Sequence, residues 1–542
     1  MSTADRTEDP SATDTGSERS TTEQNSSNWY AHYVLGVLML VYIFNFIDRN
    51  ILSILAEDIK ADLAITDAQM GFLYGTVFAV FYAVFGIPLA RFADVWTRRS
   101  LIALGLSFWS AMTAASGLAR SFPVLAVCRV GVGIGEASAS PAAYSMLSDY
   151  YPPGKRATVI AIYAAGVYIG AGIGIFLGGF ILDTWQATYP TDAPWNLRGW
   201  QVAFMAVGVP GLLMALWVRT LREPVRGISE GLVAAQHPAP FKVLGREMAA
   251  VIPPLNLLGL KAHPKALRTN FLAAVGIALA AWALVWLTGS VAQWIASGVG
   301  VYVTVSWAQS LQLRDPATYA LMFRSRAFVY TMLAFPTTAF VGYGAGFWIP
   351  PLMLRLHDVS ATEVGMYLGL GSAMGGFVGI TLGGVLADHL KRRFPGGRLI
   401  LGYITILGTI PFLLWLVYTD SLATAYILNF FLTAFAASAG GVPPSTAADL
   451  VLPRMRAVAG AYFILVNTFL GLALGPYTIG LISDYLYAQG MSDAESLRMA
   501  LALALLTFIP ALIFVWLGKR HLPADEAARL ERAKALGESA DD

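Results

Sequence analysis

Residues 90–99 read ARFADVWTRR, and residues 384–393 read GVLADHLKRR. Alanine, aspartate and two adjacent arginines occupy the same places in both stretches, and each stretch follows a long apolar run. A glycine-rich pattern is repeated as well. The first set is Gly170, Gly174, Gly178 and Gly179, and a similar second set is Gly471, Gly475, Pro476 and Gly480. The chain is therefore predicted to consist of two related halves.

The composition is that of an integral membrane protein. Of the 542 residues, 56% are hydrophobic and 13% are charged, whereas a soluble globular chain carries about 25% charged residues. The runs at 31–47, 101–119, 271–287 and 501–517 are almost free of charge, and about 18 apolar residues are enough to cross a bilayer as a helix. The net charge of +2 gives no reason to expect a nucleic-acid partner. The single cysteine, Cys128, excludes an intrachain disulfide.

Fourteen segments of the sequence are predicted to be membrane-spanning helices, so the expected fold class is an all-α integral membrane protein. The predicted spans are 31–53, 69–90, 100–118, 122–145, 156–181, 200–219, 270–289, 291–312, 327–353, 363–387, 398–418, 422–446, 456–482 and 496–517. An even number of spans places both ends of the chain on the same side of the membrane.

The basic residues indicate which side that is. If both ends are cytosolic, only five of the 36 Lys and Arg residues fall in outside loops: Lys60, Arg120, Arg198, Arg355 and Arg498. Arg49 and Arg129 fall within spans, and all the others lie on the cytosolic side. Because an excess of Lys and Arg marks cytosolic loops, both termini are predicted to be cytosolic.

Spans seven and eight are predicted to form an extra hairpin between two six-helix bundles. The hairpin lies between two basic segments, and its tip, Thr288-Gly289-Ser290, is uncharged. The expected division is a disordered cytosolic tail at 1–29, an N-terminal six-helix bundle at 30–220, a cytosolic linker at 221–326 with the hairpin at about 270–312, a C-terminal six-helix bundle at 327–518 and a cytosolic tail at 519–542.

The repeated stretches around Asp94 and Asp388 resemble the loop signature of the major facilitator superfamily and its second-half copy. The segment Gly170–Gly179 resembles the fifth-span glycine signature of that family, with Ile175 where proline is usual. The resemblance covers nearly the whole chain. It implies two six-helix bundles of the major facilitator type and a central cavity lined by spans one and four.

A narrower resemblance is to the Spinster subfamily, whose members are proposed lipid and lysolipid transporters. It rests on NFIDR at 45–49 in span one, RVGVGIGEAS at 129–138 in span four and REPVRG at 222–227 after span six. This resemblance implies an amphipathic lipid substrate, such as a lysophospholipid or a sphingosine-phosphate-like molecule. The extra hairpin departs from the twelve-span plan of the family.

Four charged residues are predicted to lie deep in the membrane: Asp48, Arg49, Arg129 and Glu136. Such side chains are costly in a bilayer unless they are paired or wetted, so we expect them to face the bundle interior. Asp48 or Glu136 is expected to carry a coupling proton, because burial and nearby arginines move a carboxyl pKa in opposite directions. Arg49 or Arg129, with Asn45, is expected to hold an anionic headgroup or to form charge pairs. The alternative is an ion-paired cluster that only fixes span one against span four.

The charged residues of the repeated stretches are predicted to form a cytosolic gate: Asp94, Arg98, Arg99, Asp388, Arg392 and Arg393. Asp94 would bond the start of a second-half helix and hold the cytosolic side shut. The alternative is a solvated loop that only sets the topology.

The leading hypothesis for function is a secondary active transporter that works by alternating access and is coupled to protons. Its substrate class follows from the Spinster resemblance alone. One alternative is a broad efflux carrier for hydrophobic drugs. Another is a membrane receptor or a membrane-embedded enzyme, but no nucleophile–base set supports an enzyme, and the six histidines show no metal spacing.

No cofactor is expected apart from the coupling proton. The chain has no G-x-x-x-x-G-K-[ST] loop, so a nucleotide partner is not expected. The expected form is a monomer among membrane lipids, in the inner membrane of a bacterium.

Overall fold

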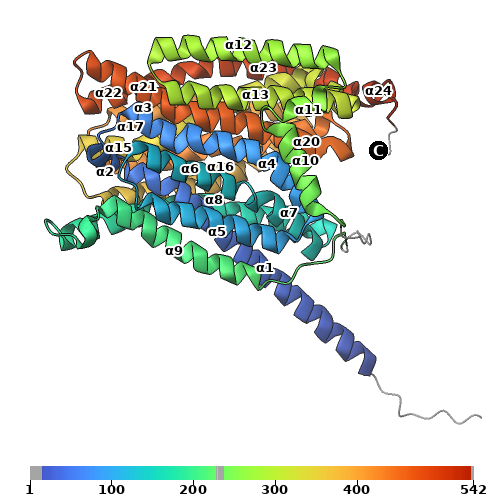
Figure 1. Cartoon of the computed structure of the whole chain (residues 1–542), viewed down its shortest axis with the longest axis horizontal. Coiled ribbons are helices and arrows are strands. Elements are labelled where there is room, and N and C mark those ends of the chain that lie inside the picture. The colour runs from blue at the N-terminus through green and yellow to red at the C-terminus, as the bar shows by residue number, and fades with distance from the viewer. Residues whose placement is uncertain (1–14, 228, 230–236, 539–542) are drawn as a thin grey trace, which may run out of the picture.

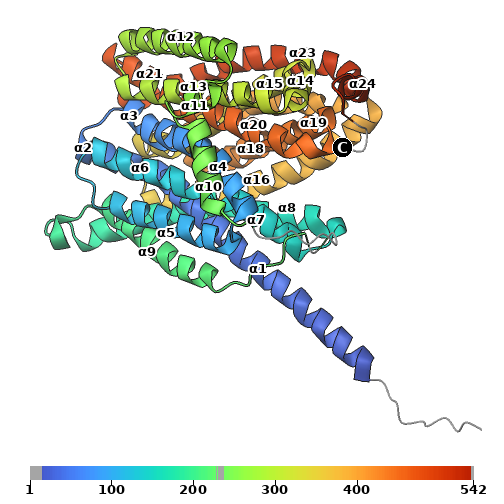
Figure 2. The ribbon, with the colours of Figure 1, turned by 45° about the vertical axis from the view of Figure 1, so that its right-hand side comes forward.

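The structure, a computed structural model, describes residues 15–227, 229 and 237–538 (Figure 1). Every regular element within these ranges is a helix, and no strand is present there. Most helices run along a common direction, and the first part of α1 (Thr15–Ile54) projects from the bundle (Figures 1 and 2). The predicted all-α fold is confirmed.

The first half consists of helices that correspond to the first six predicted spans. After α1 come α2 (Ala56–Leu63), α3 (Asp67–Gly71), the π-helical turn η1 (Phe72–Thr76), α4 (Val77–Val95), α5 (Arg98–Ser116), α6 (Phe122–Glu136), α7 (Ala139–Tyr150), α8 (Pro153–Thr188), η2 (Pro194–Asn196) and α9 (Gly199–Arg219). Helix α1 begins at Thr15, inside the tail predicted to be disordered. No proline lies between Pro10 and Pro88 to stop the helix.

The linker carries more helix than the sequence predicted. Its helices are α10 (Pro240–Val251), α11 (Asn256–Leu260), α12 (Pro264–Thr288), α13 (Val291–Arg314) and α14 (Pro316–Phe323). Helices α12 and α13 pack against each other as a hairpin on the outside of the bundle (Figure 1). Helix α10 crosses the end of α4 (Figure 2).

The second half repeats the plan of the first. It consists of α15 (Arg326–Leu356), α16 (Ala361–Arg393), η4 (Gly397–Leu399), α17 (Ile400–Tyr418), α18 (Leu422–Ser438), α19 (Val442–Leu450), η5 (Pro453–Met455), α20 (Arg456–Val466), the π-helical turn η6 (Asn467–Ala473), α21 (Leu474–Ala488), α22 (Asp493–Ala504), η7 (Leu505–Thr507) and α23 (Phe508–Ala527), with α24 (Arg529–Lys534) behind it. Helix α23 extends into the segment predicted as the tail at 519–542.

Twelve helical segments of the described chain are long and apolar enough to cross a membrane. The predicted spans at 100–118 and 291–312 fall on α5 and α13, which are not among the twelve. The chain is a multi-pass membrane protein, and a crossing by both helices of the hairpin stays a prediction.

The two halves meet along two seams. Helix α8 of the first half packs against α16 of the second, and α3 packs against α21. We call the end of the bundle where α1 ends and α3 begins the far end. We call the opposite end, where α9 ends and the linker starts, the linker end.

The glycine repeat lies at matching contacts in the two halves. A Cβ on Gly174 would lie 2.8 Å from the backbone of α1, and one on Gly475 would lie 2.4 Å from the backbone of α15. Five residues further along each chain segment, Gly179 and Gly480 each lie against the first residues of a helix of the other half. The internal repeat is thus confirmed by packing.

The contact between Gly172 and Gly369 gives a first prediction. A Cβ on Gly369 would lie 2.4 Å from the carbonyl oxygen of Gly172, so Gly369→Ala forces α8 and α16 apart. Overpacking of this kind costs about 1–3 kcal/mol, and we expect a lower melting temperature of the purified protein in detergent.

The matched control is Gly384→Ala on the same helix α16. No atom of the described residues lies within 4 Å of a Cβ at Gly384, and alanine is the better helix former by about 1 kcal/mol. Equal melting temperatures for the two variants would contradict the close approach of α8 and α16.

Candidate transport site

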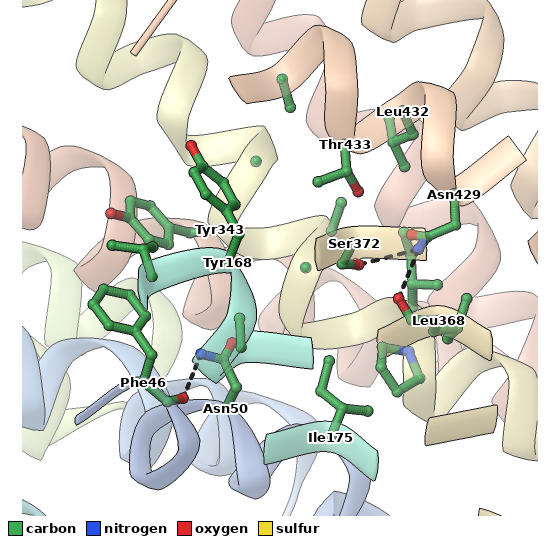
Figure 3. Close-up of a pocket in the computed structure, with 18 of the residues that line it drawn as sticks. Phe46, Asn50, Tyr168, Ile175, Tyr343, Leu368, Ser372, Asn429, Leu432 and Thr433 are labelled. Carbon is green, nitrogen blue, oxygen red and sulfur yellow. Dashed lines mark hydrogen bonds between the residues drawn. The ribbon is translucent and has the colours of Figure 1, made fainter. Parts of the chain in front are cut away.

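A cavity of about 190 Å³ lies between the two halves. Helices α1 and α8 of the first half and α15, α16 and α18 of the second supply most of its lining (Figure 3). The lining residues are Phe46, Arg49, Asn50, Tyr74, Val167, Tyr168, Ala171, Ile175, Val341, Gly342, Tyr343, Ala345, Gly346, Ile349, Pro350, Leu368, Ser372, Thr409, Asn429, Leu432, Thr433 and Ala436. Most of them are apolar or aromatic.

The polar groups of the cavity fall into two sets. On the second-half side, the Asn429 amide donates hydrogen bonds to the Leu368 carbonyl and to Ser372 Oγ, at 3.1 Å each (Figure 3). On the first-half side, Arg49 is the one ionic side chain among the lining residues. The cavity therefore has an uncharged polar wall and a cationic one.

Arg49 is held by both a carboxylate and aromatic rings. One of its terminal nitrogens donates a hydrogen bond of 2.7 Å to Glu136 Oε2. Its guanidinium carbon lies 4.7 Å from the centre of the Phe46 ring and 4.3 Å from that of Phe78, within cation–π range. These contacts fix the position of the charge beside the cavity.

A second buried pair lies behind the first. Thr113 donates a hydrogen bond to Asp48 Oδ2, and Arg129 Nη1 lies 3.6 Å from Asp48 Oδ1. Arg129 is fully buried, and none of its side-chain nitrogens has a hydrogen-bond partner among the described residues. This pair is an ionic contact without a direct hydrogen bond.

All five residues predicted for this site come together. Asn45 is buried and neighbours Glu136. The sequence left open which arginine faces the cavity, and the structure places Arg49 at the wall and Arg129 outside the lining. Asp48 and Glu136 are buried behind that wall, each beside a different arginine.

At the linker end, the first repeated stretch is tied into its own half. Arg98 forms ion pairs with Asp149 and, at 2.8 Å, with Glu223. Glu223 also accepts hydrogen bonds from the backbone N–H groups of Arg98 and Arg99, so it caps the start of α5. Asp94 is instead largely exposed, and its nearest basic partner, Arg91, is 4.0 Å away in the same helix.

The second repeated stretch, residues 384–393, makes different contacts from the first. Arg398 lies 3.7 Å from Asp388 and forms a 2.6 Å ion pair with Asp449. Arg392 and Arg393 have no ion pair among the described residues. The contact predicted between Asp94 and a second-half helix is not made in this structure, in which the opposite, far end is closed.

A charged network that the sequence did not predict closes the far end. Asp67, at the start of α3, is buried and forms ion pairs with Lys60 and, at 2.7 Å, with Arg355 of the second half. Arg355 also binds Glu57 at 2.7 Å and Asp493 at 3.2 Å. The network therefore joins the two halves.

Two aspartates cap helices across the seams of the far end. Asp484 accepts hydrogen bonds from the backbone N–H groups of Asp67 (2.9 Å) and Ala68 (2.8 Å) at the start of α3. Asp183 accepts one of 2.7 Å from the N–H of Thr362 at the start of α16. The signal was present in the sequence, because each aspartate follows a repeated glycine, Gly179 or Gly480, by the same spacing.

Two repeat-related helical bundles with a cavity at their junction have the architecture of a secondary transporter. A family model of the Major Facilitator Superfamily matches residues 38–476, so the chain belongs to that superfamily.

Comparison with known proteins places the chain beside Spinster proteins. It is 26% identical to an MFS-type efflux pump of Mycolicibacterium smegmatis, over 91% of this chain and 93% of the pump. It is 23% identical to the sphingosine-1-phosphate transporter SPNS2 of Danio rerio, over 88% of this chain and 81% of that protein.

Among solved structures, the chain is similar to a bacterial homologue of the human lysosomal transporter Spinster in an inward-facing, occupied conformation. The TM-score is 0.68 at 27% identity, and the match covers 92% of this chain and 98% of the other. The predicted resemblance to Spinster transporters is confirmed.

Proposed function

We propose that the protein is a proton-coupled secondary transporter of an anionic amphipathic lipid, such as a lysophospholipid or a sphingosine-phosphate-like molecule. The observation that carries the proposal is Arg49, a cation at the wall of an otherwise uncharged cavity. A guanidinium matches phosphate and carboxylate in shape and charge. The apolar lining suits the hydrocarbon chain of such a lipid.

The pairing of Arg49 with Glu136 supports proton coupling. An anionic headgroup that binds Arg49 competes with Glu136 for the same guanidinium. Glu136 would then be a buried carboxylate without its partner, which is costly, and taking up a proton removes that cost. Asp48, beside Arg129, is the second candidate for the same role.

The topology supports an orientation and a gate. Lys and Arg gather at the linker end, so we assign this end and both termini to the cytosol. In this structure the far end is closed by Asp183, Asp484 and the Arg355 network. When the far end opens, Asp94 is proposed to bond the start of a second-half helix. The other charged residues of the two repeated stretches would complete this cytosolic gate: Arg98, Arg99, Asp388, Arg392 and Arg393. The protein would work as a monomer in a bacterial cell membrane.

Transport into liposomes tests the proposal. With the purified protein and a pH gradient that is acidic outside, labelled lysophosphatidic acid is expected to accumulate inside the liposomes, and uncharged monoacylglycerol is not. Arg49→Lys keeps the charge but loses the planar fork, so we expect transport to fall about tenfold. Arg120→Lys, in a far-end loop, is the control and should transport normally. Equal uptake of both lipids, or no effect of the gradient, would contradict the proposal.

Efflux of hydrophobic drugs is the second candidate function. The observation that favours it is the similarity to the MFS-type efflux pump, together with the apolar lining of the cavity. Such a carrier would raise the resistance of a pump-deficient strain to uncharged drugs. That resistance would not depend on Arg49, whereas transport of an anionic lipid would.

A further inference from the structure

A second cavity lies at the linker end, away from the seam. Its volume is about 420 Å³, larger than that of the central cavity. Its walls come from α10, α11, the residue that precedes α12, and the last turns of α13. Helix α12 is covered with exposed apolar side chains, such as Phe271, Trp282 and Trp286, and it is one of the segments apolar enough to cross a membrane. His263, which precedes α12, lines the cavity, so the cavity lies at the end of this helix that would meet lipid headgroups if α12 spans the membrane as predicted.

The rim of the cavity is basic. Arg246 of α10 and Arg314 of α13 both line it, and their side chains are 74% and 54% exposed. Their shared acidic neighbour, Glu247, is 3.9 Å from each, beyond hydrogen-bond distance. Two guanidinium groups with one weakly held carboxylate leave a net positive charge at the mouth, which favours an anionic ligand.

The floor of the cavity holds a buried oxygen that has no hydrogen-bond partner in the part of the chain that the structure describes. Asn256 is 5% exposed and lines the cavity. Its Nδ2 donates to Tyr302 Oη (3.1 Å) and to Ser306 Oγ (3.0 Å). The Tyr302 hydroxyl donates its hydrogen to Asn270 Oδ1 at 2.6 Å, so Tyr302 Oη can only accept a hydrogen bond from Asn256. This arrangement fixes the amide and leaves Asn256 Oδ1 without a hydrogen bond among the described residues.

We propose that this cavity binds an anionic glycerophospholipid whose headgroup carries free hydroxyls, drawn from the leaflet at the linker end. Arg246 and Arg314 hold the phosphate, because guanidinium binds phosphate through charge-assisted hydrogen bonds. A headgroup hydroxyl donates to Asn256 Oδ1, which satisfies the orphan acceptor. Leu255 and Leu313, both exposed apolar side chains at the cavity, contact the glycerol and the first carbons of the acyl chains.

The bound lipid would act on the transport machinery through α13. Val303 of α13 packs in one cluster with Val80 and Val84 of the first half and with Phe469 of the second half. Val251, at the end of α10, belongs to the same cluster. Both helices that supply the arginines therefore touch the seam between the halves.

Native mass spectrometry of the delipidated full-length protein tests the site, with dioleoyl phosphatidylglycerol as the probe. The variant Arg246→Gln/Arg314→Gln is expected to weaken binding at least about tenfold, since it loses two charge-assisted contacts. Lys242→Gln/Arg324→Gln is the matched control. It removes the same charge from the linker end at exposed residues outside the cavity, and it should bind as the unmodified protein does.

Two further probes separate the sources of the phosphate. Phosphatidylethanolamine, which has no net charge, should bind more weakly than phosphatidylglycerol, and free glycerol phosphate should not compete with the lipid at equal concentration. The proposal is overturned if both double variants bind alike, if the two lipids bind equally, or if free glycerol phosphate displaces the lipid.

Discussion

Glu136→Gln is expected to abolish accumulation of substrate driven by a pH gradient while exchange of substrate across the membrane continues. Glutamine resembles protonated glutamate, so Arg49 is released for the headgroup at every pH. Glutamine has no negative charge to compete with the headgroup for Arg49, and its single carbonyl oxygen can give Arg49 only a neutral hydrogen bond in place of the 2.7 Å ion pair. The cavity can then bind and release the substrate, but no proton moves with it.

The measurement is uptake into liposomes with a gradient of one pH unit. One pH unit corresponds to 1.36 kcal/mol, so a carrier that moves one proton with each substrate sustains about tenfold accumulation. We expect about tenfold accumulation for the unmodified protein and none for Glu136→Gln. Counterflow of labelled against unlabelled lipid, without a gradient, should be retained by both.

Two further variants make the result specific. Asp420→Asn removes a carboxylate from an exposed position at the far end and should leave accumulation unchanged. Asp48→Asn tests the second candidate. Loss of coupling in that variant alone would show that Asp48, and not Glu136, carries the coupling proton. If Glu136→Gln also lost counterflow, Glu136 would be an ion-pair partner that holds α1 against α6, and the coupling proposal would fail.

The charged site could be predicted from the sequence because charge is costly in a bilayer. The cost of Asp48, Arg49, Arg129 and Glu136 inside apolar spans requires that they meet one another or line a cavity. The choice between Arg49 and Arg129 could not be predicted. It depends on how the helices pack: Arg49 lies over the Phe46 ring at the cavity, whereas Arg129 lies outside the lining, and packing across helices leaves no pattern within a single span.

The far-end contacts were missed for a related reason. Asp67 and Arg355 are far apart in the sequence and lie at predicted span ends, where a charged residue is ordinarily solvated. Burial of Asp67 follows from the docking of the two halves, which a helix-by-helix interpretation does not describe. The repeat nevertheless carried the information, since Asp183 and Asp484 keep the spacing of the glycines that were recognised.

The cross-half caps Asp183 and Asp484 give the second large expected effect. Asp183→Ala/Asp484→Ala should shift the protein toward an open far end, because each aspartate belongs to one half and caps a helix of the other. Loss of a capping acceptor costs about 1 kcal/mol. Two such losses change the ratio of open to closed far ends by up to roughly 30-fold.

Distances between spin labels measure this shift. The only cysteine, Cys128, is buried and can be replaced by alanine. Cysteines for labelling are then placed at the exposed positions Ala61 of the first half and Ala488 of the second, both at the far end. In the double alanine variant, the long-distance population should rise strongly over that of the unmodified background.

The graded and control variants separate capping from a general loss of charge. Asparagine caps helices about as well as aspartate, so Asp183→Asn/Asp484→Asn should shift the distances less than the alanine pair. Asp62→Ala removes a far-end carboxylate that binds Arg198 and Trp200 within the first half, so it should leave the distances unchanged. An unchanged distribution in the double alanine variant would show that the Arg355 network alone holds the far end shut, since Arg355 joins Asp67 to Asp493 without either cap.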